Sequence, residues 1–241
     1  MIGFFDSGVG GLTIAQPFYQ KTHLECLFFG DSTHCPLGEK TDNEIHEIVK
    51  SGVEKLLLAG CNLVILACNT ATAISIRDLQ QHYLPLQSFS EPKNILGIIQ
   101  PTNEAILASC VLSDSVSILA TPATIHSGFY QRELEKLGFK NIHGVSAAEL
   151  AKTIESDDKK LARQIVREIF SDNHTMIRGS KALVLACTHY PIIQNIIQDE
   201  LINIDSKALI ISQSNVVVYE LISYLQRHPE YQQTKGSFRV I

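Results

Sequence analysis

Short apolar runs alternate with amphipathic stretches along the chain, and this alternation constrains the fold more than any other feature. Two stretches predict helices. Thr41 and Glu44 have the spacing of a capping box that begins a helix running to about Ala59, and apolar residues recur every four positions across Lys159–Phe170. The runs that predict buried strands are Ile2–Phe5, Glu25–Phe29, Leu63–Leu66, Ile95–Ile98, Val116–Leu119, Asn141–Val145, Leu183–Leu185 and Leu209–Ile211. Strands that alternate with helices form βαβ units, so we predict an α/β fold with mostly parallel sheets flanked by helices.

The length of 241 residues is comfortable for two small domains that share an interface. Proline and polar residues cluster over Leu84–Asn94, and Asn203–Lys207 is a second candidate crossing point. We predict a first domain of residues 1–93 plus 207–241 and a second domain of residues 94–206. The last strand and a helix near Ser214–Gln226 would complete the first domain, and the active site would lie in the cleft between the two.

One segment has an echo elsewhere in the chain. Val64–Thr70 reads Val-Ile-Leu-Ala-Cys-Asn-Thr, and Leu183–His189 reads Leu-Val-Leu-Ala-Cys-Thr-His. Each is an apolar run that ends in Leu-Ala-Cys and continues into small polar residues. The echo indicates two similar halves, each of which offers one cysteine at the same structural place.

Composition narrows the classes of function. The net charge is −5 and no run of Lys or Arg occurs, so we expect no nucleic-acid partner. Polar residues interrupt the most apolar run, Leu56–Ile74, so we expect no membrane span. The first residues lack the basic opening of a signal peptide, and we expect a cytoplasmic protein.

The six cysteines are expected to be thiols, because a cytoplasmic chain of this length does not need disulfides. None shows the Cys-x-x-Cys spacing of a zinc or redox site, and we expect no metal. The glycine-rich turn Asp6–Gly11 lacks the lysine of a P-loop, and nothing indicates a flavin or nicotinamide site, so we expect no cofactor.

Cys68 and Cys187 are predicted at the carboxyl ends of strands, where open α/β sheets bind ligands. A helix that begins there supplies unpaired N–H groups and a positive dipole end, a setting that favours the thiolate. A thiolate and a thiol that face each other across a cleft can remove a proton from one face of a carbon and deliver one to the other. The alternative is that each cysteine only packs in the core, which is how we interpret Cys26, Cys61 and Cys110.

Other polar residues are predicted at the same sheet edges. Asp6 would bind an ammonium group or orient a cysteine, with helix capping as the alternative, and the same alternative applies to Thr121 and Thr124. His189 follows Cys187 by two positions and is a candidate proton partner. Gln100 follows the fourth strand and is expected near the cleft.

Five segments taken in order resemble the glutamate racemase family, within the wider aspartate/glutamate racemase group. They are Phe5–Thr13, Gly30–Ser32 with Pro36–Lys40, Ala67–Ala71, Ala120–Ile125 and Cys187–Pro191. The resemblance implies two α/β domains with the site between them. It also implies a racemase without pyridoxal phosphate that interconverts L- and D-glutamate and supplies D-glutamate for peptidoglycan.

The resemblance also implies roles for individual residues. Cys68 and Cys187 look like the two bases, with Asp6 and His189 as their assistants. Positions that look like substrate-binding residues are Ser7, Asn69, Thr70, Thr121, Thr124 and Thr188, with backbone contacts from the turn Pro36, Leu37 and Gly38. The expected partner is a small amino acid, and a homodimer is one assembly that the resemblance allows.

The chain departs from the family pattern at three places. Leu37 replaces the usual tyrosine, Gln100 replaces a glutamate that would help to orient the histidine, and Ala147–Glu149 stands where a Cys-Pro segment is usual. Leu37 keeps open a racemase of another acidic amino acid such as aspartate. A catalytically weak member that acts as a binding regulator is the second alternative.

Overall fold

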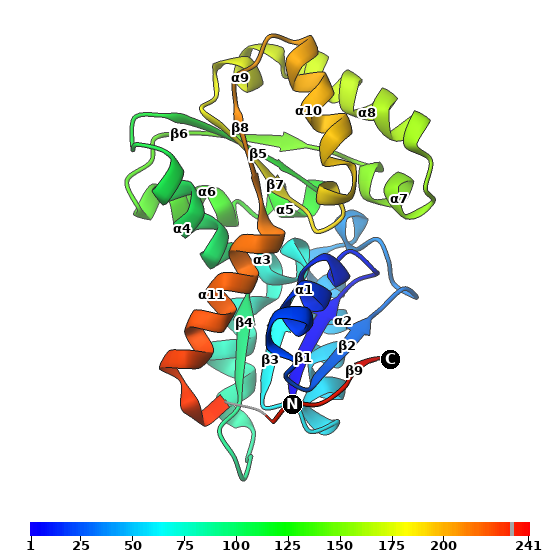
Figure 1. The fold of residues 1–241 in the computed structure, drawn as a ribbon, viewed down its shortest axis with the longest axis vertical. Coiled ribbons are helices and arrows are strands. Elements are labelled where there is room, and N and C mark those ends of the chain that lie inside the picture. Colours follow the sequence, from blue (N-terminus) through cyan, green and yellow to red (C-terminus); the bar gives the residue numbers. More distant parts are fainter. Residues whose placement is uncertain (232–233) are drawn as a thin grey trace.

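The computed structural model describes residues 1–231 and 234–241 as two lobes, each built on a parallel sheet (Figure 1). The first sheet has the order β4-β3-β1-β2-β9, with β1 Ile2–Asp6, β2 Cys26–Gly30, β3 Leu63–Leu66, β4 Asn94–Gly97 and β9 Phe238–Val240. The second has the order β6-β5-β7-β8, with β5 Ser115–Ala120, β6 Asn141–Ser146, β7 Ala182–Ala186 and β8 Leu209–Ser212. The predicted α/β class is confirmed, and each predicted strand forms with bounds shifted by at most a few residues.

The two lobes share one topology. In the first lobe the strands lie in the order β2-β1-β3-β4, and in the second they lie in the order β6-β5-β7-β8. The first strand of each lobe therefore lies between the second and the third. Cys68 follows β3 and Cys187 follows β7, the third strand in each case. The echo in the sequence thus corresponds to the same place in both sheets.

Helices cover both faces of the sheets. The first lobe carries α1 Leu12–Thr22, α2 Asp42–Leu58 and α3 Asn69–Asp78, and α11 Gln213–Arg227 packs against α1. The second lobe carries α5 Pro122–His126, α6 Phe129–Lys136, α7 Leu150–Glu155, α8 Lys159–Asp172, α9 His174–Gly179 and α10 Gln194–Asn203. The predicted capping box is present at α2, where the Thr41 and Glu44 side chains each bind the other's backbone N–H. No helix within residues 1–231 and 234–241 is long and apolar enough to cross a membrane.

The chain crosses between the lobes later than predicted at both points. β4 pairs with β3 and so belongs to the first sheet, whereas the prediction began the second domain at residue 94. β8 pairs with β7 in the second sheet, whereas the prediction returned the chain to the first domain at residue 207. The crossings therefore follow Gly97 and Ser212. The physical reason is strand pairing: the proline-rich stretch before β4 is a loop within the first lobe.

The interface between α2 and β1 gives a test of packing. Gly52 is a buried residue of α2, and a Cβ atom there would overlap the ring of Phe5. A helical Gly→Ala change gains about 1 kcal/mol of helix propensity, whereas overpacking a core costs about 1–3 kcal/mol. We expect Gly52→Ala to lower the free energy of unfolding, measured by chemical denaturation.

Gly179→Ala is the matched control. Gly179 is an exposed residue of α9, and a Cβ atom there would meet nothing within 4 Å. This change should leave the stability equal or raise it by up to about 1 kcal/mol. Equal stability changes at the two glycines would show that the contact with Phe5 does not limit the approach of α2.

Candidate active site

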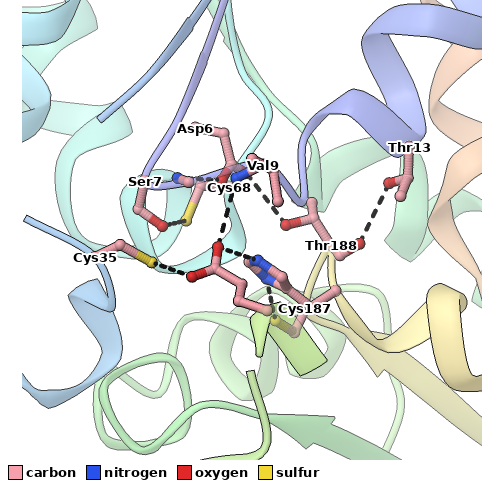
Figure 2. Close-up of polar contacts among 11 residues, drawn as sticks. Asp6, Ser7, Val9, Thr13, Cys35, Cys68, Cys187 and Thr188 are labelled. Atoms are coloured by element: carbon pink, nitrogen blue, oxygen red, sulfur yellow. Dashed lines mark hydrogen bonds and ion pairs between the residues drawn. The ribbon is translucent and has the colours of Figure 1, made fainter. Parts of the chain in front are cut away.

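Cys68 and Cys187 lie at the carboxyl ends of β3 and β7 and have different neighbours (Figure 2). Cys68 is the N-cap residue of α3, and its sulfur accepts a hydrogen bond from the backbone N–H of Ala71 at 3.5 Å. The Ser7 hydroxyl lies 3.8 Å from the same sulfur. The Cys187 sulfur lies 3.7 Å from Nδ1 of His189. The two thiols therefore come from matching positions, one beside a hydroxyl and the other beside an imidazole.

Cys68 and Cys187 line a single small cavity. Its wall comes from both lobes and consists of Ser7, Cys35, Pro36, Leu37, Gly38, Cys68, Asn69, Thr70, Thr121, Ala151, Ala186, Cys187, Thr188 and His189. The structure thus brings most of the predicted site residues to one space. Cys35, which the sequence left unassigned, also lines this cavity. Two thiols in one cavity, contributed from two sides, can act as acid and base on one bound carbon.

Asp6 and Thr124 are the two predicted site residues that lie behind the wall. Asp6 is fully buried and accepts hydrogen bonds from the hydroxyl of Thr188 at 3.1 Å and from the N–H of Gly8 at 2.8 Å. It makes no capping bond to α1. Asp6 thus reaches the cavity through Thr188 rather than directly.

Three threonine hydroxyls join the lobes at the cavity. Thr70 of the first lobe lies 2.9 Å from Thr121 and 3.1 Å from Thr124 of the second, measured between hydroxyl oxygens. Thr121 also caps α5, because its hydroxyl accepts from the N–H of Thr124 at 3.4 Å. The capping alternative for Thr121 is therefore confirmed, and the same hydroxyl contributes to the cavity wall.

Glu155 is a residue of the site that sequence reasoning missed. One of its carboxylate oxygens accepts from Nε2 of His189 at 2.8 Å, and the other accepts from the Cys35 thiol at 3.3 Å. Gln100 was expected near the cleft at the position of the family's orienting glutamate. It bonds instead to Glu104, on the exposed surface of α4 (Ile99–Ser109). The histidine is therefore oriented by Glu155, from the last residue of α7.

The glycine-rich turn after β1 lets the second lobe approach the first. A Cβ atom at Gly8 would overlap the carboxylate of Glu155, and one at Gly10 would lie 2.5 Å from the hydroxyl oxygen of Thr188 and 2.7 Å from Cε1 of His189. In the structure, side chains of the opposite lobe occupy the space that the glycines leave.

Burial governs the electrostatics of the first lobe's side of the cavity. Burial, followed by the charge of Asp6, raises the pKa of the Cys68 thiol to about 12. The expectation that the helix end favours the thiolate of Cys68 is therefore wrong, because desolvation exceeds the effect of the N–H groups. Burial also raises the pKa of Asp6 to about 6, against the opposing charge of His189.

His189 carries the positive charge of the site. Burial lowers its pKa, but the hydrogen bonds with Cys187 and Glu155 outweigh burial and hold the pKa well above its ordinary value. The hydrogen bond from His189 in turn lowers the pKa of Glu155. The cationic imidazole is thus placed to share a proton with the Cys187 sulfur.

Within residues 1–231 and 234–241, no three His, Cys, Asp or Glu side chains gather in a way that could hold a metal ion. All six cysteines are thiols, and Cys26, Cys61 and Cys110 are buried in the apolar core, as predicted.

Comparison with known proteins places this geometry in a family. The family model described as Asp/Glu/Hydantoin racemase matches residues 15–216. A glutamate racemase from Roseobacter denitrificans is 35% identical over 240 residues, which cover 95% of this chain and 86% of that protein. A glutamate racemase from Ruegeria pomeroyi is 34% identical with the same coverage.

Solved structures agree. A glutamate racemase isoform from Bacillus anthracis superimposes with a TM-score of 0.85 at 27% identity, over 100% of this chain and 87% of that one. The glutamate racemase from Francisella tularensis, solved in complex with D-glutamate, gives a TM-score of 0.84 at 26% identity, over 99% of this chain and 86% of that one. Sequence and fold together show that the chain belongs to the Asp/Glu/hydantoin racemase family.

Proposed function

We propose that this protein interconverts L- and D-glutamate by proton transfer at Cα between Cys68 and Cys187. The observation that carries the proposal is that matching strands of the two lobes deliver one thiol each to a single cavity. The relatives named above are glutamate racemases, which supports glutamate as the substrate. We further propose that the reaction takes place in the cytoplasm and supplies D-glutamate for peptidoglycan, and a homodimer stays a prediction.

Each direction of the reaction needs one sulfur as base and the other as acid. A thiolate removes the α-proton, the thiol on the opposite face delivers a proton, and the roles exchange for the other enantiomer. Positioned acid–base groups of this kind contribute roughly 10²–10⁴-fold to the rate. N–H groups at the start of α3 can hold the substrate carboxylate, which stabilises the developing negative charge.

The substrate itself changes the charge balance. The pKa of Cys68 is raised to about 12, first by burial and then by the charge of Asp6. A substrate ammonium group would place a positive charge near the Cys68 thiol, and a nearby cation favours the thiolate. Substrate binding is thus expected to assist the ionisation of the base. The hydroxyl of Thr188, which donates a hydrogen bond to Asp6, would link the charge of Asp6 to the cavity.

Leu37 bears on which substrate is used. It is buried, lines the cavity and replaces a tyrosine with a side chain that has no hydroxyl. Competition between L-aspartate and L-glutamate tests the alternative substrate.

The basic test of the proposed function is loss of optical activity from L-glutamate, together with incorporation of deuterium at Cα in heavy water without added cofactor. Absence of both would refute the proposal.

Single cysteine variants test the two-base mechanism. We expect Cys68→Ser and Cys187→Ser each to lower racemisation by about 10²-fold or more, because a hydroxyl is a much weaker acid than a thiol. The two enantiomers have equal free energy, so kcat/KM must stay equal in both directions and cannot separate the roles. Deuterium exchange at Cα can: each variant should lose exchange from one enantiomer more than from the other, and the affected enantiomer should differ between the variants.

Cys110→Ser is the control, because Cys110 is buried in the core outside the cavity. Its racemisation should stay within about twofold of the parent chain. If both active-site variants lost exchange equally from both enantiomers, the assignment of one sulfur to each face would be wrong.

Asp6→Asn tests how far the buried carboxylate lowers the free energy of unfolding. The pKa of Asp6 is raised by burial from 3.8 to about 6, so between these values the folded chain binds more protons than the unfolded chain. The free energy of unfolding therefore falls as the pH rises through this window. We expect Asp6→Asn to lower activity but to raise stability by about 1–3 kcal/mol above pH 6, with less gain near pH 4.

Urea denaturation from pH 4 to 8 measures this difference. Asp172→Asn, at an exposed position at the end of α8, should change the stability by less than about 0.5 kcal/mol. A stability gain for Asp6→Asn that did not grow with pH would contradict the assigned burial of charge.

A further inference from the structure

A buried polar cluster joins the lobes behind the Cys68 side of the cavity. It consists of Asn69 of α3, Thr102 of α4, Tyr130 of α6 and Gln213, the first residue of α11, and all four side chains are buried. Gln213 follows the crossing after β8, and Thr102 lies just after the crossing that follows β4. Figure 1 shows α11 beginning where the chain descends from β8, at the junction of the lobes. We call these four residues the junction cluster.

Gln213 is the centre of the junction cluster. Its amide oxygen accepts from Nδ2 of Asn69 at 2.6 Å, and its Nε2 lies 3.0 Å from Oδ1 of Asn69. The same Nε2 lies 2.8 Å from the hydroxyl oxygen of Thr102 and 3.1 Å from that of Tyr130. The side chain at one crossing therefore contacts the other crossing segment, the turn that follows Cys68 and a helix of the second lobe.

The placement of hydrogens makes a glutamine amide the group required at this position. Thr102 donates its hydroxyl hydrogen to the carbonyl of Ile98 at 2.7 Å, and Tyr130 donates to Oδ1 of Asn69 at 2.7 Å. Burial raises the pKa of Tyr130, so its hydroxyl stays protonated and able to donate. The three oxygens around Nε2 of Gln213 thus offer lone pairs, and they share the two hydrogens of the NH₂ group.

The junction cluster also determines what Asn69 presents to a ligand. Oδ1 of Asn69 accepts from Tyr130 and Gln213, and Nδ2 donates to Gln213. At most one hydrogen of the side-chain amide is left for a bound molecule. Asn69 directly follows Cys68, so the bonds that hold the Asn69 side chain also hold the turn that carries the thiol.

We propose that Gln213 is a positioning residue that, through the junction cluster, holds the Cys68 turn at the correct place relative to the second lobe. The proposal rests on the proposed function, because the distance that matters is the one between the two thiols and a bound Cα. Displacements of about 1 Å from the productive geometry can lower a rate by 10²-fold. Loss of this side chain should therefore affect turnover more than substrate affinity.

The test compares Gln213→Met with the parent chain. Methionine has a similar length but cannot replace the hydrogen bonds, so buried partners are left unpaired. We expect kcat per folded molecule to fall at least about tenfold while KM changes less than about threefold. Tyr130→Phe, which removes one hydroxyl on the second lobe, should lower kcat in the same sense but less. The folded fraction is measured for every variant by circular dichroism at the assay temperature.

Gln80→Met is the matched control. Gln80 is an exposed glutamine whose Nε2 donates to the carbonyl of Ile95 at 2.7 Å, and both residues belong to the first lobe. Its kcat should stay within about twofold of the parent chain. A purely structural role for Gln213 would lower the melting temperature and leave kcat per folded molecule unchanged, which would overturn the proposal. If Gln213→Met does not fold, an unchanged kcat in Tyr130→Phe overturns it instead.

Hydrogen exchange gives a readout that does not need turnover. The amides in the first turn of α3 should exchange at least about tenfold faster in Gln213→Met than in the parent chain. Their exchange rates should be unchanged in Gln80→Met. Unchanged exchange in Gln213→Met overturns the positioning role. Failure of the parent chain to racemise glutamate would refute the proposed function. Faster amide exchange in Gln213→Met would then still support the role of Gln213 in holding the turn.

Discussion

The contact between the lobes over the glycine-rich turn after β1 is the interaction on which the site depends. At Gly8 and Gly10 the first lobe presents bare backbone, and Glu155, Thr188 and His189 of the second lobe fill the space. A side chain at either glycine would push the lobes apart. The same contact brings Thr188 over Asp6 and seats His189 against the turn, so closure of the lobes brings the Cys187–His189 pair to the side of the cavity that carries Cys68.

Buried polar groups at this interface are held by different means on the two sides. On the first lobe, Asp6 and Cys68 lie close together and burial opposes the charge of both. On the second, Glu155 stabilises the cation of His189 beside Cys187. Behind the wall, Gln213 satisfies neutral partners from three helices. Burial of Asp6 at the cavity therefore lowers the stability of the fold, whereas the hydrogen bonds of Gln213 hold the turn that follows Cys68 in place.

The strands and the pair of cysteines could be predicted because their signals are local. An apolar run bounded by turns identifies a strand, and the repeated Leu-Ala-Cys marks two matching ends. Glu155 could not be found this way, because a carboxylate at the end of a short helix has no motif and gains its role only when α7 packs beside the segment that carries His189. The crossing points were misplaced because the partner of β8 is decided by tertiary pairing. The short strand β9 has no clear apolar pattern and gave no signal.

The shared strand order of the lobes has a kinetic consequence. Equivalent strands bring equivalent sulfurs to the cavity, yet Ser7 stands beside one and His189 beside the other. The two lobes have the same strand order, but the side chains that can exchange protons with the two sulfurs differ. The reactions of the two enantiomers therefore need not share a rate-limiting step. A substitution beside one sulfur can slow the removal of the α-proton from one enantiomer, while turnover of the other enantiomer stays limited by product release.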